Sequence, residues 1–117
     1  MKQALAFPSG SRMGRPFGGL LMLFVATCVD KPDSADKRVE NRPAHLVYLK
    51  GLGARVKTGG ALLAPDHKTP VGSMIIFEAE SEADVLTLVA KDPFSLAGLF
   101  ERVSVKPWRQ GVGQSLT

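Results

Sequence analysis

Two residues of this 117-residue chain, His45 and Asp92, carry side chains suited to proton transfer. His45 follows Pro43, where a helix can begin, and the macrodipole in a first helical turn favours a neutral imidazole, which can act as a base. Asp92 precedes Pro93, and its carboxylate can cap a short helix that begins there. A carboxylate bonded to one imidazole nitrogen fixes the tautomer and raises the basicity of the other nitrogen. The pair therefore predicts a general base, with helix capping as the structural alternative for Asp92.

Three further polar side chains are candidates for contact with a small-molecule substrate. Arg42, at the predicted helix start, could bind an anionic substrate, although a solvated arginine is common at such a position. Ser73, at the mouth of a strand, could donate a hydrogen bond or serve the preceding turn. His67 lies in that turn beside Asp66 and is interpreted as an exposed loop residue. We therefore expect Arg42 and Ser73 to bind substrate.

The cysteine content bears on metal sites and on the redox compartment. Cys28 is the single cysteine, so no internal disulfide can form, and the cysteine and the two histidines lack the spacing of a zinc site. Because Cys28 falls in an apolar run, it is more typical of a small core residue than of a nucleophile. The sequence predicts no metal and no cofactor, and the reducing compartment that it favours is the cytoplasm.

The charge distribution argues against a nucleic-acid partner. The formal net charge is +4, but residues 1–21 hold three of the 15 basic residues and none of the 11 acidic ones. The rest of the chain is nearly neutral and has no basic stripe interleaved with aromatic residues. No run approaches the roughly 18 apolar residues that a membrane-spanning helix needs. We expect neither nucleic acid nor a membrane as a partner.

The elements that must position these residues follow from apolar periodicity and from Gly and Pro breaks. Residues 1–19 predict a flexible extension and residues 111–117 a C-terminal tail, on either side of one domain over residues 20–110. In the first half of the domain we predict a strand over 20–29, a charged loop or short helical turn over 31–42 and a helix over 43–52. A strand over 56–64, a turn over 65–72 and a strand over 73–80 follow. The last elements are a helix over 81–91 with an S-x-x-D capping signature, a short helix after Pro93, and a strand over 100–105 that Pro107 ends.

The order of these elements, β-α-β-β-α-β, is typical of ferredoxin-like α+β domains with an antiparallel sheet. Both helices then cover one face of the sheet, and apolar side chains of strand 20–29 on the other face need a cover. A second copy of the chain would supply it, which predicts a homodimer. In this topology the start of the first helix and the end of the second lie at one end of the sheet. His45 and Asp92 are therefore expected to meet.

Three segments resemble the YCII-related, or YciI-like, family: R-P-A-H-L at 42–46, D-P-F at 92–94 and V-S-V-K-P-W at 103–108. The resemblance covers about residues 22–108, in the family's order and spacing. It implies a ferredoxin-like dimer of the dimeric α+β barrel type with an active site of one histidine and one aspartate, which map onto His45 and Asp92. It does not imply a settled reaction.

Two functional hypotheses follow. In the first, the chain is a small-molecule enzyme in which His45 moves a proton and Asp92 orients it, with lyase-like or isomerase-like chemistry. In the second, it is a non-catalytic ligand-binding or dimerisation module. Hydrogen-bonding distance between the two side chains in an accessible pocket favours the enzyme, and a filled cleft favours the module.

Overall fold

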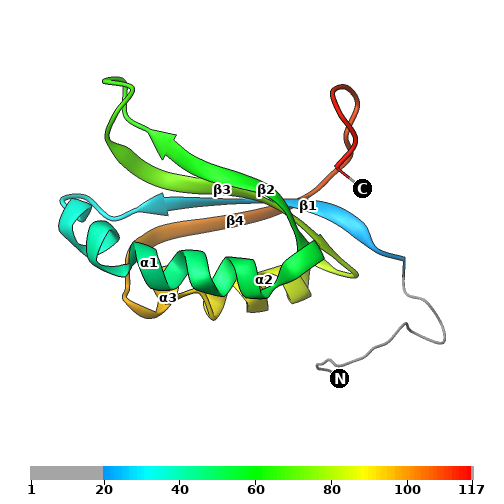
Figure 1. The fold of residues 1–117 in the computed structure, drawn as a ribbon, viewed down its shortest axis with the longest axis horizontal. Helices are drawn as coiled ribbons and strands as arrows, with labels where there is room; N and C mark the ends of the chain where they lie inside the picture. Colours follow the sequence, from blue (N-terminus) through cyan, green and yellow to red (C-terminus); the bar gives the residue numbers. More distant parts are fainter. Residues whose placement is uncertain (1–19, 117) are drawn as a thin grey trace.

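A four-stranded antiparallel sheet carries its helices on one face in the computed structural model, which describes residues 20–116 (Figure 1). The predicted extension over residues 1–19 lies outside the described residues. The elements are β1 (Met22–Asp30), α1 (Ala35–Gly51), a short 3-10 helix (Gly53–Arg55), β2 (Val56–Leu63), β3 (Pro70–Ala79), α2 (Glu82–Ala90), α3 (Pro93–Leu96) and β4 (Phe100–Trp108). The predicted ferredoxin-like α+β class is confirmed.

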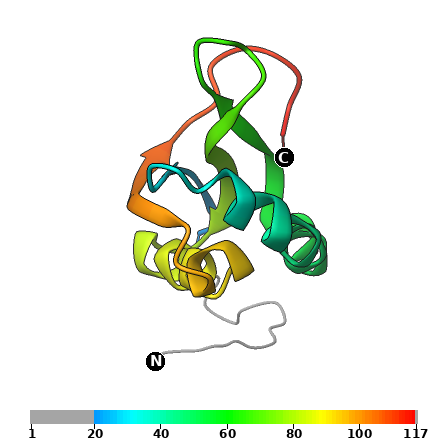
Figure 2. The ribbon, with the colours of Figure 1, turned by 90° about the vertical axis from the view of Figure 1, so that its left-hand side faces the viewer.

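The sheet has the strand order β2-β3-β1-β4, so β1 and β3 are its central strands. Phe24 of β1 pairs with Phe77 of β3, and Ala26 of β1 pairs with Val105 of β4. These side chains face the helices and are buried in the core between the two layers. Viewed from the side, the helices form one layer below the sheet, and the β2–β3 hairpin extends away from them (Figure 2).

Side chains of β1 alternate between two environments. Phe24, Ala26 and Cys28 face the helices and are at most 2% exposed, whereas Leu23 and Val25 point to the opposite face and are only partly buried. Because successive strand residues point to opposite faces, this second row is apolar without belonging to the core. We call the side of the sheet away from the helices the open face. In Figure 1 the C-terminal segment lies on that side.

The largest departure from the sequence-based expectation concerns the first helix. Residues 31–42 were expected to form a loop or a short turn and Pro43 to begin the helix, but α1 begins at Ala35 and contains Pro43 in its interior. Asp36 in the first turn and Lys50 in the last complement the macrodipole, and the charged residues between them are good helix formers. The expectation that Pro43 begins the helix is therefore wrong. It rests on the compatibility of proline with the first turn of a helix.

Two strand boundaries also differ from expectation. β3 begins at Pro70 instead of Ser73, and β4 continues through Pro107 to Trp108. Because β4 is an edge strand, a residue without a backbone N–H is tolerated there. The predicted helix over 81–91 is confirmed: the Ser81 side chain caps α2 by accepting a hydrogen bond from the Asp84 amide. None of the helices in the described part of the chain is long and apolar enough to cross a membrane.

Candidate active site

The buried polar and charged residues of the described chain form two hydrogen-bonded pairs, Arg38–Ser73 and His45–Asp92, that share contacts with the ring of Phe94. They are Arg38, His45, Ser73 and Asp92, with exposed fractions between 2% and 7%. Burying such groups is unfavourable unless they are paired and hydrogen-bonded, so their partners reveal how the cluster is built. We call these four residues the buried polar cluster.

His45 and Asp92 are in direct contact. The His45 Nδ1 atom lies 2.9 Å from Oδ1 and 2.8 Å from Oδ2 of Asp92. Asp92 Oδ1 also accepts a hydrogen bond of 2.8 Å from the Phe94 amide, so Asp92 caps α3 as well. The contact with His45 and the capping contact, which the sequence offered as alternatives for Asp92, are both present in the structure. The cap fixes the carboxylate from one side and the imidazole contacts it from another.

The reason expected for this contact was partly wrong. His45 lies ten residues after Ala35, past the middle of α1, and not in the first turn of the helix. Since the influence of the macrodipole falls off within the first turn, it does not explain a neutral imidazole here. The pair meets because α1 is long and because α2 ends at Ala90, close to the point on α1 that carries His45.

One aromatic ring stacks on the imidazole, and a second ring packs behind it. The ring of Phe94 stacks on that of His45, with 3.9 Å between the centroids and 15° between the planes. Phe100 packs edge-on against Phe94. Offset stacking and edge-to-face contacts are the favourable arrangements of such rings, and they restrict the orientation of the imidazole. His45 is therefore held both by a carboxylate and by an aromatic plane.

Arg38 is the member of the cluster that the sequence analysis missed. Its Nη1 lies 3.1 and 3.0 Å from the two carboxylate oxygens of Asp30, and its Nη2 donates hydrogen bonds of 2.8 Å to the Gly72 carbonyl and the Ser73 hydroxyl. The guanidinium also lies 4.8 Å from the centroid of the Phe94 ring. Arg38 thus joins α1 to the ends of β1 and β3 and to α3. The planar guanidinium carries several N–H donors in a fixed arrangement, so it can bond to several oxygen atoms at once.

A signal for Arg38 was present in the sequence but hidden by the misplaced helix start. Arg38 and His45 are seven residues apart, which places them on one face of a helix two turns apart. When residues 31–42 are interpreted as a loop, that spacing has no meaning.

The other predicted site residues have different environments. Ser73 belongs to the cluster, where its oxygen accepts the bond from Arg38. Arg42 is exposed on α1 and makes no hydrogen bond or ion pair with His45 or Asp92. His67 is exposed in the β2–β3 turn, where its φ of 64° lies in the left-handed region, so the expectation of a loop residue is confirmed.

Burial and charge shift the protonation of groups near the cluster. Burial raises the pKa of the Cys28 thiol to about 12, and the negative charges of Asp92 and Asp30 add to the effect, while Arg38 opposes it. Burial also raises the pKa of Asp30, against the stabilising charge and hydrogen bonds of Arg38. Cys28 is therefore a protonated core residue at neutral pH, as its place in an apolar run predicted, and not a nucleophile.

The arrangement at His45 suits a general base. An ionised carboxylate only accepts hydrogen bonds, so Nδ1 is the nitrogen that donates to it; whenever the imidazole is neutral, the free electron pair is then on Nε2. Within residues 20–116, the hydrogen bonds of His45 all use Nδ1. Nε2 is thus the ring nitrogen that the contact with Asp92 does not use. No group of three His, Cys, Asp or Glu side chains among the described residues could hold a metal ion.

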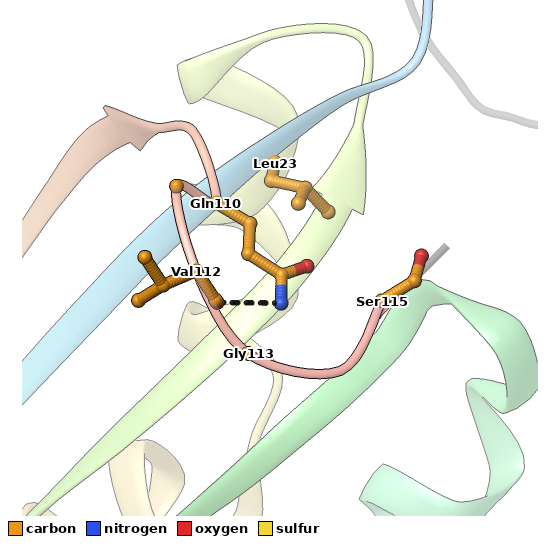
Figure 3. Close-up of a pocket in the computed structure, with 6 residues that line it drawn as sticks. Leu23, Gln110, Val112, Gly113 and Ser115 are labelled. Atoms are coloured by element: carbon orange, nitrogen blue, oxygen red, sulfur yellow. Dashed lines mark hydrogen bonds between the residues drawn. The ribbon is translucent and has the colours of Figure 1, made fainter.

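A pocket of about 410 Å³ lies apart from the buried polar cluster (Figure 3). Leu23 of β1 contributes its wall on the open face, and the segment from Gln110 to Ser115 provides the rest. The Gln110 side chain holds that segment through bonds to the carbonyl oxygens of Val112 and Gln114 and to the Leu116 amide. Since no member of the cluster lines this pocket, the two features are separate.

The chain is similar to known proteins over most of its length. The sequence matches the YCII-related domain over residues 22–109. The protein YciI of Escherichia coli O6:H1 is 40% identical over 96 residues, which cover 76% of this chain and 98% of YciI.

Two solved structures support the fold. One is the 5-chloro-2-hydroxyhydroquinone dehydrochlorinase TftG of Burkholderia phenoliruptrix AC1100, in complex with 2,5-dihydroxybenzoquinone. It is 41% identical to this chain with a TM-score of 0.70, and the match covers 77% of this chain and 96% of TftG. A second structure, from Bacteriodes thetaiotaomicron, shares the fold alone. It is 12% identical with a TM-score of 0.50, and the match covers 81% of this chain and 96% of the other. The domain match and the identity to YciI together show that this chain is a member of the YCII-related family.

Proposed function

We propose that this protein is a small-molecule enzyme with lyase-like chemistry, in which His45 transfers a proton and Asp92 orients it. The observation that carries the proposal is the buried contact of 2.8 Å between His45 Nδ1 and Asp92 Oδ2. A general base must be held in one tautomer with its free nitrogen available, and this contact provides the first of these conditions. The stacking on Phe94 restricts the ring further.

The relationship to TftG supports an elimination from a hydroxylated aromatic ring. TftG is a dehydrochlorinase of a chlorinated hydroxyhydroquinone, and its fold and 41% identity relate it to this chain. For the present protein, Nε2 of His45 would accept a proton from one hydroxyl group of the ring. The electron pair of that O–H bond forms a carbonyl group, and the ring carbon that bears the leaving group takes up a proton. Loss of a proton from a second hydroxyl group then forms the second carbonyl group of a quinone, while the leaving group departs with the electron pair of its bond to carbon. Two protons leave oxygen, one proton is gained by carbon and one anion is released, so the net loss is one molecule of acid and no external oxidant or reductant is consumed.

Arg42 and Ser73 are proposed to bind the substrate. Arg42 lies three residues before His45 on α1, within one helical turn, and its exposed guanidinium suits an ionised phenol at the mouth of the site. The Ser73 oxygen accepts a hydrogen bond from Arg38, and its own O–H remains able to donate to a ligand.

A homodimer is part of the proposal, because the open face needs a cover. Leu23 and Val25 of β1 pair with Glu78 and Ile76 of β3 across that face, and they lie outside the core formed with the helices. A second copy that packs its own open face on this one would bury these apolar side chains. The cytoplasmic location expected from the single cysteine stays a prediction.

The alternative, a non-catalytic ligand-binding or dimerisation module, is favoured by one observation. Both members of the pair are almost buried, at 7% exposure for His45 and 3% for Asp92. A buried and paired imidazole can serve the structure alone. The experiment below distinguishes the two functions.

The test is a screen of chlorinated and unchlorinated hydroxyhydroquinones for chloride release and quinone formation. The proposal predicts turnover by the wild-type protein and a loss of at least about 100-fold in His45→Ala, since general-base catalysis contributes roughly 10²–10⁴-fold. His67→Ala is the matched control, because His67 is an exposed histidine in a turn. Ligand binding without turnover would support the non-catalytic module, and equal losses in the two variants would contradict the role of His45.

A further inference from the structure

Tyr48 provides a second connection beside the His45–Asp92 contact. It lies on α1 three residues after His45, so the two side chains project from neighbouring positions on one face of the helix. The Tyr48 hydroxyl donates a hydrogen bond of 2.7 Å to the carbonyl oxygen of Leu88 in α2. The bond therefore links α1 to α2 close to the point where α1 contacts Asp92.

The Leu88 carbonyl needs a donor because of the way α2 ends. In a continuing helix the amide of Asp92 would donate to Leu88, four residues earlier. That amide instead donates to the Val89 carbonyl at 3.1 Å, because the chain tightens as it leaves the helix. The Tyr48 hydroxyl supplies the donor that the helix itself does not.

The two links act on the same short segment. Leu88 and Asp92 are four residues apart, and between them the chain leaves α2 and turns towards α3. Tyr48 holds the first of these residues and His45 contacts the second. Two attachments from one rigid helix restrict both the position and the direction of this turn. These two attachments add to the burial of Val89 and Phe94, which also holds this segment.

The Tyr48 hydroxyl is suited to a permanent donor. Burial raises its pKa to about 12, and the negative charge of Asp92 adds to this shift, against the opposing charge of Arg55. The hydroxyl therefore keeps its proton at neutral pH and the bond to Leu88 persists.

We infer that Tyr48 is a positioning residue for the proposed reaction: its bond to the Leu88 carbonyl holds the end of α2 against α1 and thereby fixes the Asp92 carboxylate against His45. The inference rests on the proposed function for its catalytic meaning. The positioning itself depends only on the contacts of Tyr48, Leu88, Asp92 and His45.

The test uses Tyr48→Phe, which removes the hydroxyl and keeps the ring. The readout is the rate at which the His45 Nδ1 proton exchanges with water, followed by nuclear magnetic resonance on ¹⁵N-labelled full-length protein. His67→Asn in every sample leaves one histidine, and asparagine tolerates the positive φ at that position. We expect exchange to be about three- to tenfold faster in Tyr48→Phe, the change that corresponds to one lost hydrogen bond.

Thr87→Val is the matched control. The exposed Thr87 hydroxyl donates a hydrogen bond of 3.1 Å to the Ala83 carbonyl oxygen within α2. Its loss therefore removes a side-chain hydrogen bond from α2 without changing a contact with α1. We expect this variant to leave the exchange rate within twofold of the wild type. An unchanged rate in Tyr48→Phe, or an equal acceleration in Thr87→Val, would overturn the inference.

Turnover provides a second arm that separates this inference from the proposed function. With a substrate from the screen, Tyr48→Phe should lower kcat about two- to tenfold and leave KM within twofold, because Tyr48 orients the base without binding substrate. If His45→Ala retains full activity, the proposed function fails, and the proton-exchange measurement still decides whether Tyr48 positions Asp92. An unchanged kcat in Tyr48→Phe while His45→Ala is inactive would count against Tyr48 alone.

Discussion

The Arg38 guanidinium donates a hydrogen bond of 2.8 Å to the Ser73 hydroxyl, which attaches α1 to β3. The same helix carries His45 seven residues later, where it contacts Asp92. α1 is therefore fixed to the sheet at one point and to the α2–α3 turn at another. The geometry of the proposed base depends on both attachments.

Removal of the Arg38 charge should destabilise the fold strongly. Arg38→Met leaves the carboxylate of Asp30 without its cation in a place where both side chains are at most 8% exposed. Breaking one partner of such a pair costs about 3–5 kcal/mol. Urea denaturation should show a loss of this size in the free energy of unfolding. The control is Arg42→Met, which replaces an exposed arginine on the same helix and should change the free energy of unfolding by about 0.5 kcal/mol or less. Similar losses in both variants would refute the role assigned to Arg38.

Alkaline pH should weaken the fold through Cys28. The pKa of its thiol is about 12 in the folded protein, above the ordinary value of 9.0, so the folded state keeps a proton that the unfolded chain releases. The resulting stability is fully present below pH 9 and is lost as the pH rises through 12.

Urea midpoints at pH 7 and pH 10.5 measure this effect, with Cys28→Ala as the control that lacks the thiol. The midpoint of the wild type should fall more steeply between the two pH values than that of the variant. Parallel declines would show that other groups, and not the thiol, govern alkaline stability. Labelling by a thiol reagent at pH 8 should also be slow until urea unfolds the chain, because Cys28 is 1% exposed.

The open face should be the dimer interface. Val25→Asp introduces a charge in the centre of this face, next to Ile76 of β3 and Lys106 of β4. Light scattering at micromolar concentration should give twice the chain mass of 12.5 kDa for the wild type and the single chain mass for Val25→Asp. Val39→Asp, on an exposed position of α1, should remain dimeric. A wild-type monomer with an intact fold would contradict the proposed dimer.

The sheet and the second half of the chain could be predicted from local signals. The apolar run of β1 has apolar residues at both odd and even positions, and the Ser81 cap precedes α2. The β-α-β-β-α-β order fixes which ends of the elements lie together. These signals depend on periodicity and capping within a few residues. The contact between His45 and Asp92 followed from topology, even though His45 is not in a first turn.

The start of α1 and the role of Arg38 could not be predicted in this way. Pro43 fits the first turn of a helix as well as an interior position, and the charged residues before it are common in loops and in exposed helices. The partners of Arg38 are Asp30, eight residues away at the end of β1, and Ser73, which is 35 residues away and adjoins Arg38 only in the folded sheet. Tertiary contacts, not local preference, decide such a position.

A double-mutant cycle on His45 and Asp92 tests the central claim most directly. The measurement is kcat/KM of the wild type, His45→Ala, Asp92→Asn and the double variant with the best substrate of the screen. Asparagine keeps the ability to cap α3, so the fold should be retained. We predict that His45→Ala lowers activity at least about 100-fold and Asp92→Asn at least about tenfold. Because groups that act as a unit are not additive, the double variant should be little worse than His45→Ala. Full activity in either single variant, or losses that multiply in the double variant, would contradict a His45–Asp92 catalytic pair.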